Sequence, residues 1–307
     1  MIAAIAALKK LGLTALEPRG SALFDVRAVQ DRIGAYLSCQ TEPVELEFDV
    51  AVSGPDGPIS CHFYGYASPT PVPLLVYFHG GGFIYGSAEG WGGLMRDLVR
   101  LAGIFVLNVD YRLAPEYAFP AGVIDAVAVI NHAQRHAADW GADDSMVAAG
   151  GDSAGANLAL VAEMLRRDCG ELPLQFLLLF YGVFSGRTDT ESWTRLGTGA
   201  YGLSQSQMEW IWETYLQEPG QRLDWRACPL IGDLSKLPPV HQAIGTLDPL
   251  LDDAYALKQK LDASGVPNSL VVYPGVNHGF IRFNNTVREA GRAVEDAAKA
   301  LCAVLKR

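Results

Sequence analysis

Ser153 lies between two glycines, in the run Gly151-Asp152-Ser153-Ala154-Gly155. The run follows an apolar segment, 146–149, and precedes a helical pattern over 156–167. A serine in a tight turn from strand to helix is typical of a nucleophile elbow, in which flanking glycines let the two backbones approach and the turn exposes the hydroxyl. The pentapeptide alone also fits an ordinary glycine turn, so its interpretation depends on what accompanies it.

A glycine-rich loop precedes this serine in the chain. The apolar run 74–78 leads into the sequence His79-Gly80-Gly81-Gly82-Phe83. Three successive glycines expose backbone N–H groups, which together with the amide of Ala154 would form an oxyanion hole for an acyl-transfer reaction. The alternative is a flexible glycine turn. His79 is interpreted as an anchor of the loop and not as a base.

A serine nucleophile needs a histidine to take its proton and a carboxylate to orient that histidine. In folds with this elbow, the acid and then the histidine follow the serine in the chain. Only two histidines follow Ser153. His241 lies inside the apolar run 240–244, whereas His278 lies in a turn-rich loop beyond the strand pattern 270–273. The order and the loop therefore predict His278 as the base.

Three aspartates compete for the role of the acid. Asp248 comes shortly after the predicted strand 240–244. Asp252 and Asp253 stand where the next helix is expected to begin, and carboxylates there are favoured by the helix dipole. We interpret these two mainly as structural and predict Asp248 as the acid.

The elements that must position these residues follow an alternating pattern. The segment 44–52 alternates apolar and acidic residues and predicts a half-buried edge strand, with 59–66 as its antiparallel partner. Continuous apolar runs predict buried strands at 74–78, 104–109, 146–149, 174–180, 240–244 and 270–273. Helical patterns at 94–101, 123–135, 156–167, 252–263 and 286–305 separate or follow them. The sequence predicts an α/β fold with a mostly parallel sheet of about eight strands flanked by helices.

Two segments fall outside this alternation. Residues 1–45 precede the first strand and contain a helical pattern over 22–37. Residues 185–228 are rich in aromatic side chains, namely Trp193, Tyr201, Trp210, Trp212, Tyr215 and Trp225. We expect these two segments to form a helical cap over a catalytic core made of 46–184 and 229–307.

Composition limits the partners and the setting. Half of the 307 residues are hydrophobic and the formal net charge is −10, which disfavours binding to nucleic acid or to an anionic membrane surface and suits a small neutral substrate. The five scattered cysteines suggest neither a disulfide framework nor a zinc site, and the expected setting is the cytoplasm. The first eight residues are interpreted as an amphipathic helix and not as a signal peptide, and no membrane span is expected.

Taken together, these motifs resemble the bacterial hormone-sensitive-lipase-like carboxylesterases of the α/β-hydrolase fold. The matching stretches are 79–83, 110–116, 119–120, 151–155, 248–250 and 278–280. The resemblance implies Ser153 as nucleophile, Asp248 and His278 as its partners, and the amides of Gly81, Gly82 and Ala154 as oxyanion donors. It also implies a cap, and the family often forms homodimers. By the same analogy, 110–116 is a scaffold signature near the site, whereas the residues alone also allow a charged surface turn.

The expected reaction is ester hydrolysis through an acyl-enzyme on Ser153, with a small-molecule ester as partner and without a cofactor or metal. Phe83, Trp210 and Tyr215 are candidates for an apolar pocket for short or medium acyl chains, although Trp210 and Trp212 could equally pack the core of the cap. An acyltransferase or amidase would use the same residues, and a non-catalytic small-ligand-binding protein is a further alternative. Two departures from the family pattern, Gly182 and the sequence 251–253, affect local packing and not the proposed reaction.

Overall fold

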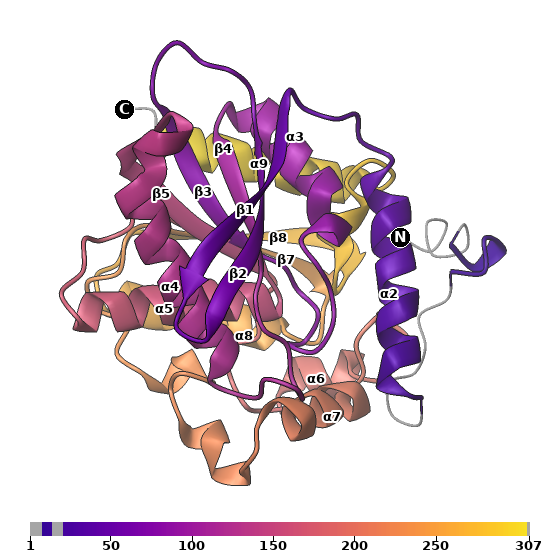
Figure 1. Ribbon diagram of the computed structural model, residues 1–307. Helices are drawn as coiled ribbons and strands as arrows, with labels where there is room; N and C mark the ends of the chain where they lie inside the picture. Colours follow the sequence, from indigo (N-terminus) through magenta and orange to yellow (C-terminus); the bar gives the residue numbers. More distant parts are fainter. Residues whose placement is uncertain (1–7, 14–20, 306–307) are drawn as a thin grey trace.

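A single sheet of eight strands forms the centre of the molecule (Figure 1). The computed structural model describes residues 8–13 and 21–305. The strands are β1 Leu46–Gly54, β2 Gly57–Gly65, β3 Val72–Phe78, β4 Phe105–Asp110, β5 Ala142–Asp152, β6 Leu177–Phe180, β7 Val240–Leu247 and β8 Asn268–Asn277. Their spatial order is β1-β2-β4-β3-β5-β6-β7-β8. The first two pairs, β1 with β2 and β2 with β4, are antiparallel and the rest of the sheet is parallel. The predicted fold class is confirmed.

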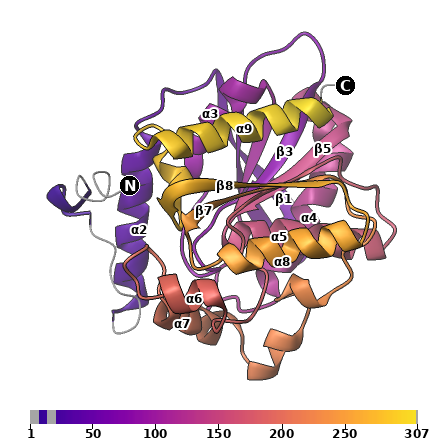
Figure 2. The same cartoon turned by 180° about the vertical axis from the view of Figure 1, so that it is seen from behind.

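Helices cover both faces of the sheet. The longer ones are α2 Leu23–Ser38, α3 Gly92–Ala102, α4 Ala121–His136, α5 Ala154–Asp168, α6 Glu191–Leu196, α7 Gln205–Tyr215, α8 Leu251–Ala263 and α9 Arg288–Leu305. In both views, α3 and α9 lie on one side of the sheet, and α4, α5 and α8 lie on the other (Figures 1 and 2). No helix among residues 8–13 and 21–305 is both long enough and apolar enough to cross a membrane.

The observed strands match the predicted ones in number and order but differ at their ends. The strand β5 spans eleven residues, whereas the apolar run 146–149 predicts only its middle. It continues past the apolar run at its end because its glycines still pair with neighbouring backbones: Gly150 lies opposite Tyr77, and Gly151 opposite Phe78. Ladder hydrogen bonds use backbone groups, so they extend a strand beyond its apolar side chains.

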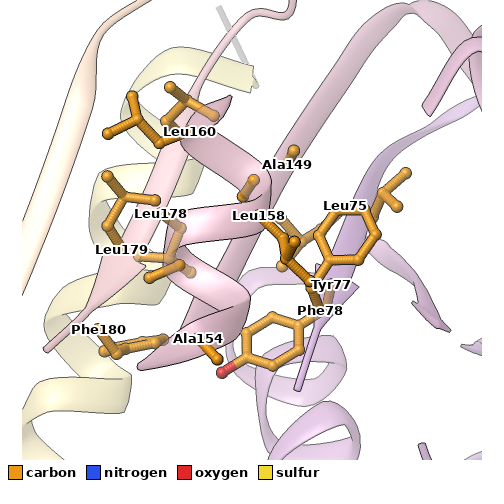
Figure 3. Close-up of a cluster of buried hydrophobic side chains, with 14 of the residues drawn as sticks. Leu75, Tyr77, Phe78, Ala149, Ala154, Leu158, Leu160, Leu178, Leu179 and Phe180 are labelled. Atoms are coloured by element: carbon orange, nitrogen blue, oxygen red, sulfur yellow. The ribbon is translucent and has the colours of Figure 1, made fainter. Parts of the chain in front are cut away.

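The helix that follows Ser153 is held in the middle of the core. Nearly every residue of α5 from Ala154 to Met164 is buried. Its Ala154, Leu158 and Leu160 lie among side chains of the strands on either side, as Figure 3 shows. Those strand residues include Leu75, Tyr77 and Phe78 of β3 and Leu178, Leu179 and Phe180 of β6. Full burial of one such leucine contributes about 1.5–3 kcal/mol, so the helix that carries Ser153 at its start is firmly fixed.

The helices outside the alternation lie together beyond one end of the sheet. In both views one end of α2 approaches α6 and α7 (Figures 1 and 2). The helix α7 begins with a capping box, in which Ser204 accepts from the amide of Gln207 and the Gln207 side chain accepts from the amide of Ser204. Short 3₁₀ turns, η3 Pro219–Leu223 and η4 Pro229–Ile231, complete the return to β7. The amphipathic helix predicted for the first eight residues falls almost wholly on 1–7, outside the described residues.

Candidate active site

Ser153 occupies a sharp turn between β5 and α5. Its φ of +54° and ψ of −116° are unusual for a residue with a side chain. The turn is tight because the helix start passes directly over β3: a Cβ at Gly155 would lie 1.8 Å from the carbonyl oxygen of Phe78. Only glycine fits at Gly155, which explains the spacing found in the sequence.

The structure brings Ser153, His278 and Asp248 into one line of hydrogen bonds. The Ser153 hydroxyl lies 3.0 Å from Nε2 of His278, and Nδ1–H of His278 donates to Oδ2 of Asp248 at 2.9 Å. They follow β5, β8 and β7, whose carboxyl ends meet at one edge of the parallel sheet. The Asp248 side chain is fully buried, whereas 13% of the His278 side chain is exposed. The line thus runs from a buried carboxylate to a partly exposed hydroxyl.

The competing residues lie elsewhere and have other partners. Asp253 accepts hydrogen bonds from the amides of Phe184 and Ser185 and from the Ser185 hydroxyl, each at 2.8 Å. Asp252 accepts from the amide of Ser192. His241 is buried in β7 with Nδ1 2.8 Å from the Ser269 hydroxyl, and burial lowers its pKa. None of these three contacts the Ser153–His278 pair, which agrees with their structural interpretation.

The two aspartates on α8 also fix the beginning of segment 185–228. Their partners, Ser185 and Ser192, stand at its beginning. At its far end, the amide of Leu230 donates to the carbonyl of Phe184 at 3.1 Å. The segment therefore leaves and re-enters the core at a hydrogen-bonded neck beside the start of α8.

The glycine loop between β3 and α3 folds back on itself. The amides of Ile84 and Tyr85 both donate to the carbonyl of Gly81, and Gly81 and Gly82 have φ values of +118° and +60°. Ala154 is the first residue of α5, a position at which the N–H has no partner inside the helix. The proposed donors thus belong to a constrained loop and to a helix start.

His79 anchors this loop, as the sequence indicates. Its ring is buried and stacks on Tyr111, with ring centroids 4.5 Å apart. Nδ1–H of His79 donates to the carbonyl of Gly80 at 2.7 Å, and the Tyr111 hydroxyl donates to the carbonyl of His79 at 2.8 Å. Burial lowers the pKa of His79, so the ring is kept neutral, as an anchor requires.

Comparison with known proteins identifies the family. A family model described as "alpha/beta hydrolase fold" matches residues 75–282. An acetyl esterase of Salmonella typhi is 34% identical over 262 residues, covering 83% of this chain and 80% of that protein. The chain belongs to the hormone-sensitive-lipase-like α/β-hydrolases. The resemblance inferred from the motifs is confirmed.

Solved structures of esterases agree with this assignment. A Pyrobaculum calidifontis esterase superposes with a TM-score of 0.91 at 33% identity, covering 94% of this chain and 95% of that one. A thermophilic carboxylesterase cloned from a metagenomic library gives 0.92 at 33% identity, covering 95% and 100%. This α/β-hydrolase is accordingly a carboxylic ester hydrolase.

The family signature 110–116 joins the glycine loop to the rest of this hydrolase. Tyr111, which bonds to His79, belongs to this segment. In addition, the amide of Ala114 donates to the carbonyl of Phe83 at 2.9 Å. Its Glu116 forms a bidentate ion pair with Arg27 of α2, both contacts at 2.7 Å, and Arg27 also donates to the carbonyls of Ile84 and Ala114. The segment is thus a scaffold and not a free surface turn. Arg27 was not apparent from the sequence, because its partners are 57 or more residues away.

The aromatic candidates lie between the glycine loop and α7. Phe83 and Tyr215 stack face to face, with ring centroids 3.9 Å apart and planes 7° apart, and each is only 1% exposed. Trp212 is equally buried and contacts both rings, whereas Trp210 is partly buried. Packing of α7 against the glycine loop therefore explains Trp212. In this structure the stacked rings of Phe83 and Tyr215 form a buried apolar contact that supports the glycine loop.

The departures from the family pattern are accommodated locally. Gly182 packs against the ring of Phe184, which occupies the position that a side chain at 182 would need. In the sequence 251–253, Asp252 and Asp253 hold the neck already described. Among the described residues, no three or more His, Cys, Asp or Glu side chains gather in a group that could hold a metal ion.

Proposed function

We propose that this hydrolase cleaves esters of short- to medium-chain carboxylic acids through an acyl-enzyme on Ser153. The observation that carries the proposal is the continuous line of hydrogen bonds from Ser153 through His278 to Asp248. Such a line converts a weak hydroxyl nucleophile into an effective one, because the histidine removes its proton as it attacks.

The proposed reaction has two halves. Ser153 Oγ attacks the ester carbonyl while Nε2 of His278 takes its proton, and the proton then passes to the departing alkoxide as the C–O bond breaks. Water attacks the acyl-enzyme with His278 as base, releasing the acid and restoring Ser153. Asp248, buried and bonded to Nδ1–H, holds the required tautomer and stabilises the imidazolium.

The amides of Gly81, Gly82 and Ala154 are the proposed donors to the oxyanion. What supports this is their position: the first two lie in the constrained loop before α3, and the third opens α5 directly after Ser153. Donors that are fixed before the reaction stabilise developing charge without having to reorganise.

A small acyl group fits this arrangement best. The side chain of Ile211 on α7 packs against Gly82, and the Phe83–Tyr215 stack fills the space behind it. Trp210 is the remaining candidate for the pocket wall. Acetyl ester hydrolysis, the activity named for the Salmonella relatives, is consistent with such a restricted acyl site. The hydrogen-bonded neck at Phe184 and Leu230 and the approach of α2 to α6 and α7 support a division into a core of 46–184 and 229–307 and a cap of 1–45 and 185–228.

The test uses Ser153→Ala with chromogenic esters of two to twelve acyl carbons. We expect the variant to retain its fold and to lose kcat by a factor of about 10⁵ or more, because the nucleophile is absent. The wild type is expected to turn over the shorter esters fastest and to be labelled once, on Ser153, by an organophosphonate. Activity of the variant within tenfold of the wild type would refute the assignment.

A further inference from the structure

A buried carboxylate that the proposed mechanism does not use lies next to Ser153. Asp152 ends β5 and is only 2% exposed. Its Oδ1 accepts hydrogen bonds from the amide of Gly80 at 2.9 Å and from the Tyr77 hydroxyl at 3.1 Å, and its Oδ2 accepts from the Tyr181 hydroxyl at 3.3 Å. One carboxylate thus joins three segments: the end of β3, the first glycine of the loop and the residue after β6.

The contact with Gly80 bears directly on the glycine loop. The Gly80 amide belongs to the His79–Gly80 peptide, which directly precedes the peptide that carries the Gly81 amide, so fixing it sets where the chain enters the loop. The approach is close: a Cβ at Gly80 would lie 2.4 Å from Oδ2 of Asp152. The Asp152 carboxylate therefore determines where the loop starts.

The contact with Tyr181 leads to the histidine. The Tyr181 ring meets the His278 ring edge to face, with centroids 5.0 Å apart and planes at 64°. Tyr181 holds this place with a φ of +36° and is 1% exposed. A residue with a side chain keeps such a backbone conformation only when its surroundings require it. The hydroxyl bond to Asp152 is part of that requirement.

The protonation states suit this arrangement. Burial raises the pKa of both tyrosines well above their usual value, so their hydroxyls remain protonated and donate. Burial also raises the pKa of Asp152. The positive charge of Arg282 and the hydrogen bonds from Tyr77 and Gly80 act in the opposite direction and lower that pKa. Three donors directed at one carboxylate are what a buried acceptor needs.

We propose that Asp152 is a positioning residue for ester hydrolysis, holding the glycine loop and the His278 ring in register on either side of Ser153. The inference rests on the proposed function, because it assigns Asp152 an effect on Gly81, Gly82 and His278. It acts through these groups and does not itself touch the reacting atoms.

Asp152→Asn is the test, because it preserves shape and one acceptor oxygen while it removes the charge and the second acceptor. The matched control is Asp253→Asn, which alters an equally buried carboxylate with three donors that lies away from Ser153. Rates are normalised to the fraction of enzyme that a phosphonate titrates. For Asp152→Asn we expect kcat to fall about 10- to 100-fold with KM within threefold, somewhat less than the loss of a whole donor. For Asp253→Asn we expect kcat to stay within threefold.

A second readout separates positioning from general damage. In a thionoester, sulfur replaces the carbonyl oxygen and is a weak hydrogen-bond acceptor, so its hydrolysis depends less on the oxyanion donors. We expect Asp152→Asn to lower the ester-to-thionoester ratio of kcat/KM at least threefold, and Asp253→Asn to leave it unchanged. Tyr181→Phe should lower kcat by a smaller factor and add little to Asp152→Asn in the double variant.

Three outcomes would overturn the proposal: an unchanged kcat in Asp152→Asn, an unchanged ratio, or full additivity with Tyr181→Phe. If Asp152→Asn does not fold, Tyr77→Phe and Tyr181→Phe decide by the same ratio, because each removes a single hydroxyl. Loss of activity in Ser153→Ala together with normal behaviour of all these variants would refute only the positioning role. An active Ser153→Ala would instead refute the proposed function.

Discussion

Two neighbouring glycines in the loop before α3 are expected to respond very differently to the same substitution. At Gly82 the φ is +60°, and the three atoms nearest to an added Cβ all belong to the Ile211 side chain, with Cδ1 at 2.8 Å. At Gly81 the φ is +118°, and the Cβ would lie 1.9 Å from the carbonyl oxygen of Tyr85. The first obstacle is a side chain, of which Cγ1 and Cγ2 also lie within 3.3 Å. The second is backbone.

The magnitudes follow from these contacts. Placing alanine in the left-handed region costs about 1–2 kcal/mol, and the Ile211 side chain must also move, so Gly82→Ala should lower the free energy of unfolding by about 2 kcal/mol. Gly81→Ala must also open the turn closed by the amides of Ile84 and Tyr85. We expect a loss of about 4 kcal/mol or more, the range of severe backbone lesions.

The assay is urea unfolding followed by tryptophan fluorescence, together with kcat/KM on a short-chain ester. Gly265→Ala calibrates the backbone cost alone, because its φ is +68° and nothing lies within 4 Å of its Cβ position. Gly82→Ala should stay within about tenfold of the wild-type kcat/KM, whereas Gly81→Ala should lose about 10²–10³, the value of one oxyanion donor. Equal effects of the two substitutions, or a larger effect at Gly82, would refute the reasoning.

Two further predictions concern aspartates. Asp248→Asn should lower kcat by about 10⁴ at unchanged stability, because an amide favours the wrong tautomer of His278; a loss below tenfold in steady-state assays would contradict the role given to Asp248. Burial raises the pKa of Asp253 to about 6. Because the folded state then holds this proton more tightly than the unfolded chain, the Asp253 contribution to stability should fall by roughly 3 kcal/mol as pH rises from about 4 to 6. The stability of Asp253→Asn, measured by thermal unfolding, should lack this decline. If the stabilities of the variant and the wild type changed with pH in the same way, the contribution assigned to Asp253 would be refuted.

The order of strands and helices was predictable because each element carries its own pattern. The run 240–244 is wholly buried in β7, although His241 and Gln242 are polar, and this run and the run 270–273 suffice to place Asp248 and His278 shortly beyond two strands. The beginning of β5 was less predictable: Asp143, Asp144 and Ser145 lie at a register shift between the pairs Val72–Ala142 and Leu74–Val147, and they carry no apolar signal.

Contacts between distant segments were beyond the sequence. The role of Asp253 depends on amides 68 and 69 residues away, and that of Arg27 on carbonyls 57 and 87 residues away. Tyr77 and Tyr181 were missed as partners of Asp152. The only local signal was a tyrosine at or just after the end of an apolar strand, a place where a hydroxyl commonly finds a buried acceptor.

The hydrogen bond between Phe184 and Leu230 brings the two ends of the intervening segment together, so the segment can be exchanged as a unit. Its beginning is fixed to the start of α8 and its far end is hydrogen-bonded to Phe184, so an insertion or deletion between them need not alter the path of β6 or β7. Loop-closure cost rises only slowly with length. A segment of different length grafted between these anchors should therefore leave the register of β5, β7 and β8 unchanged.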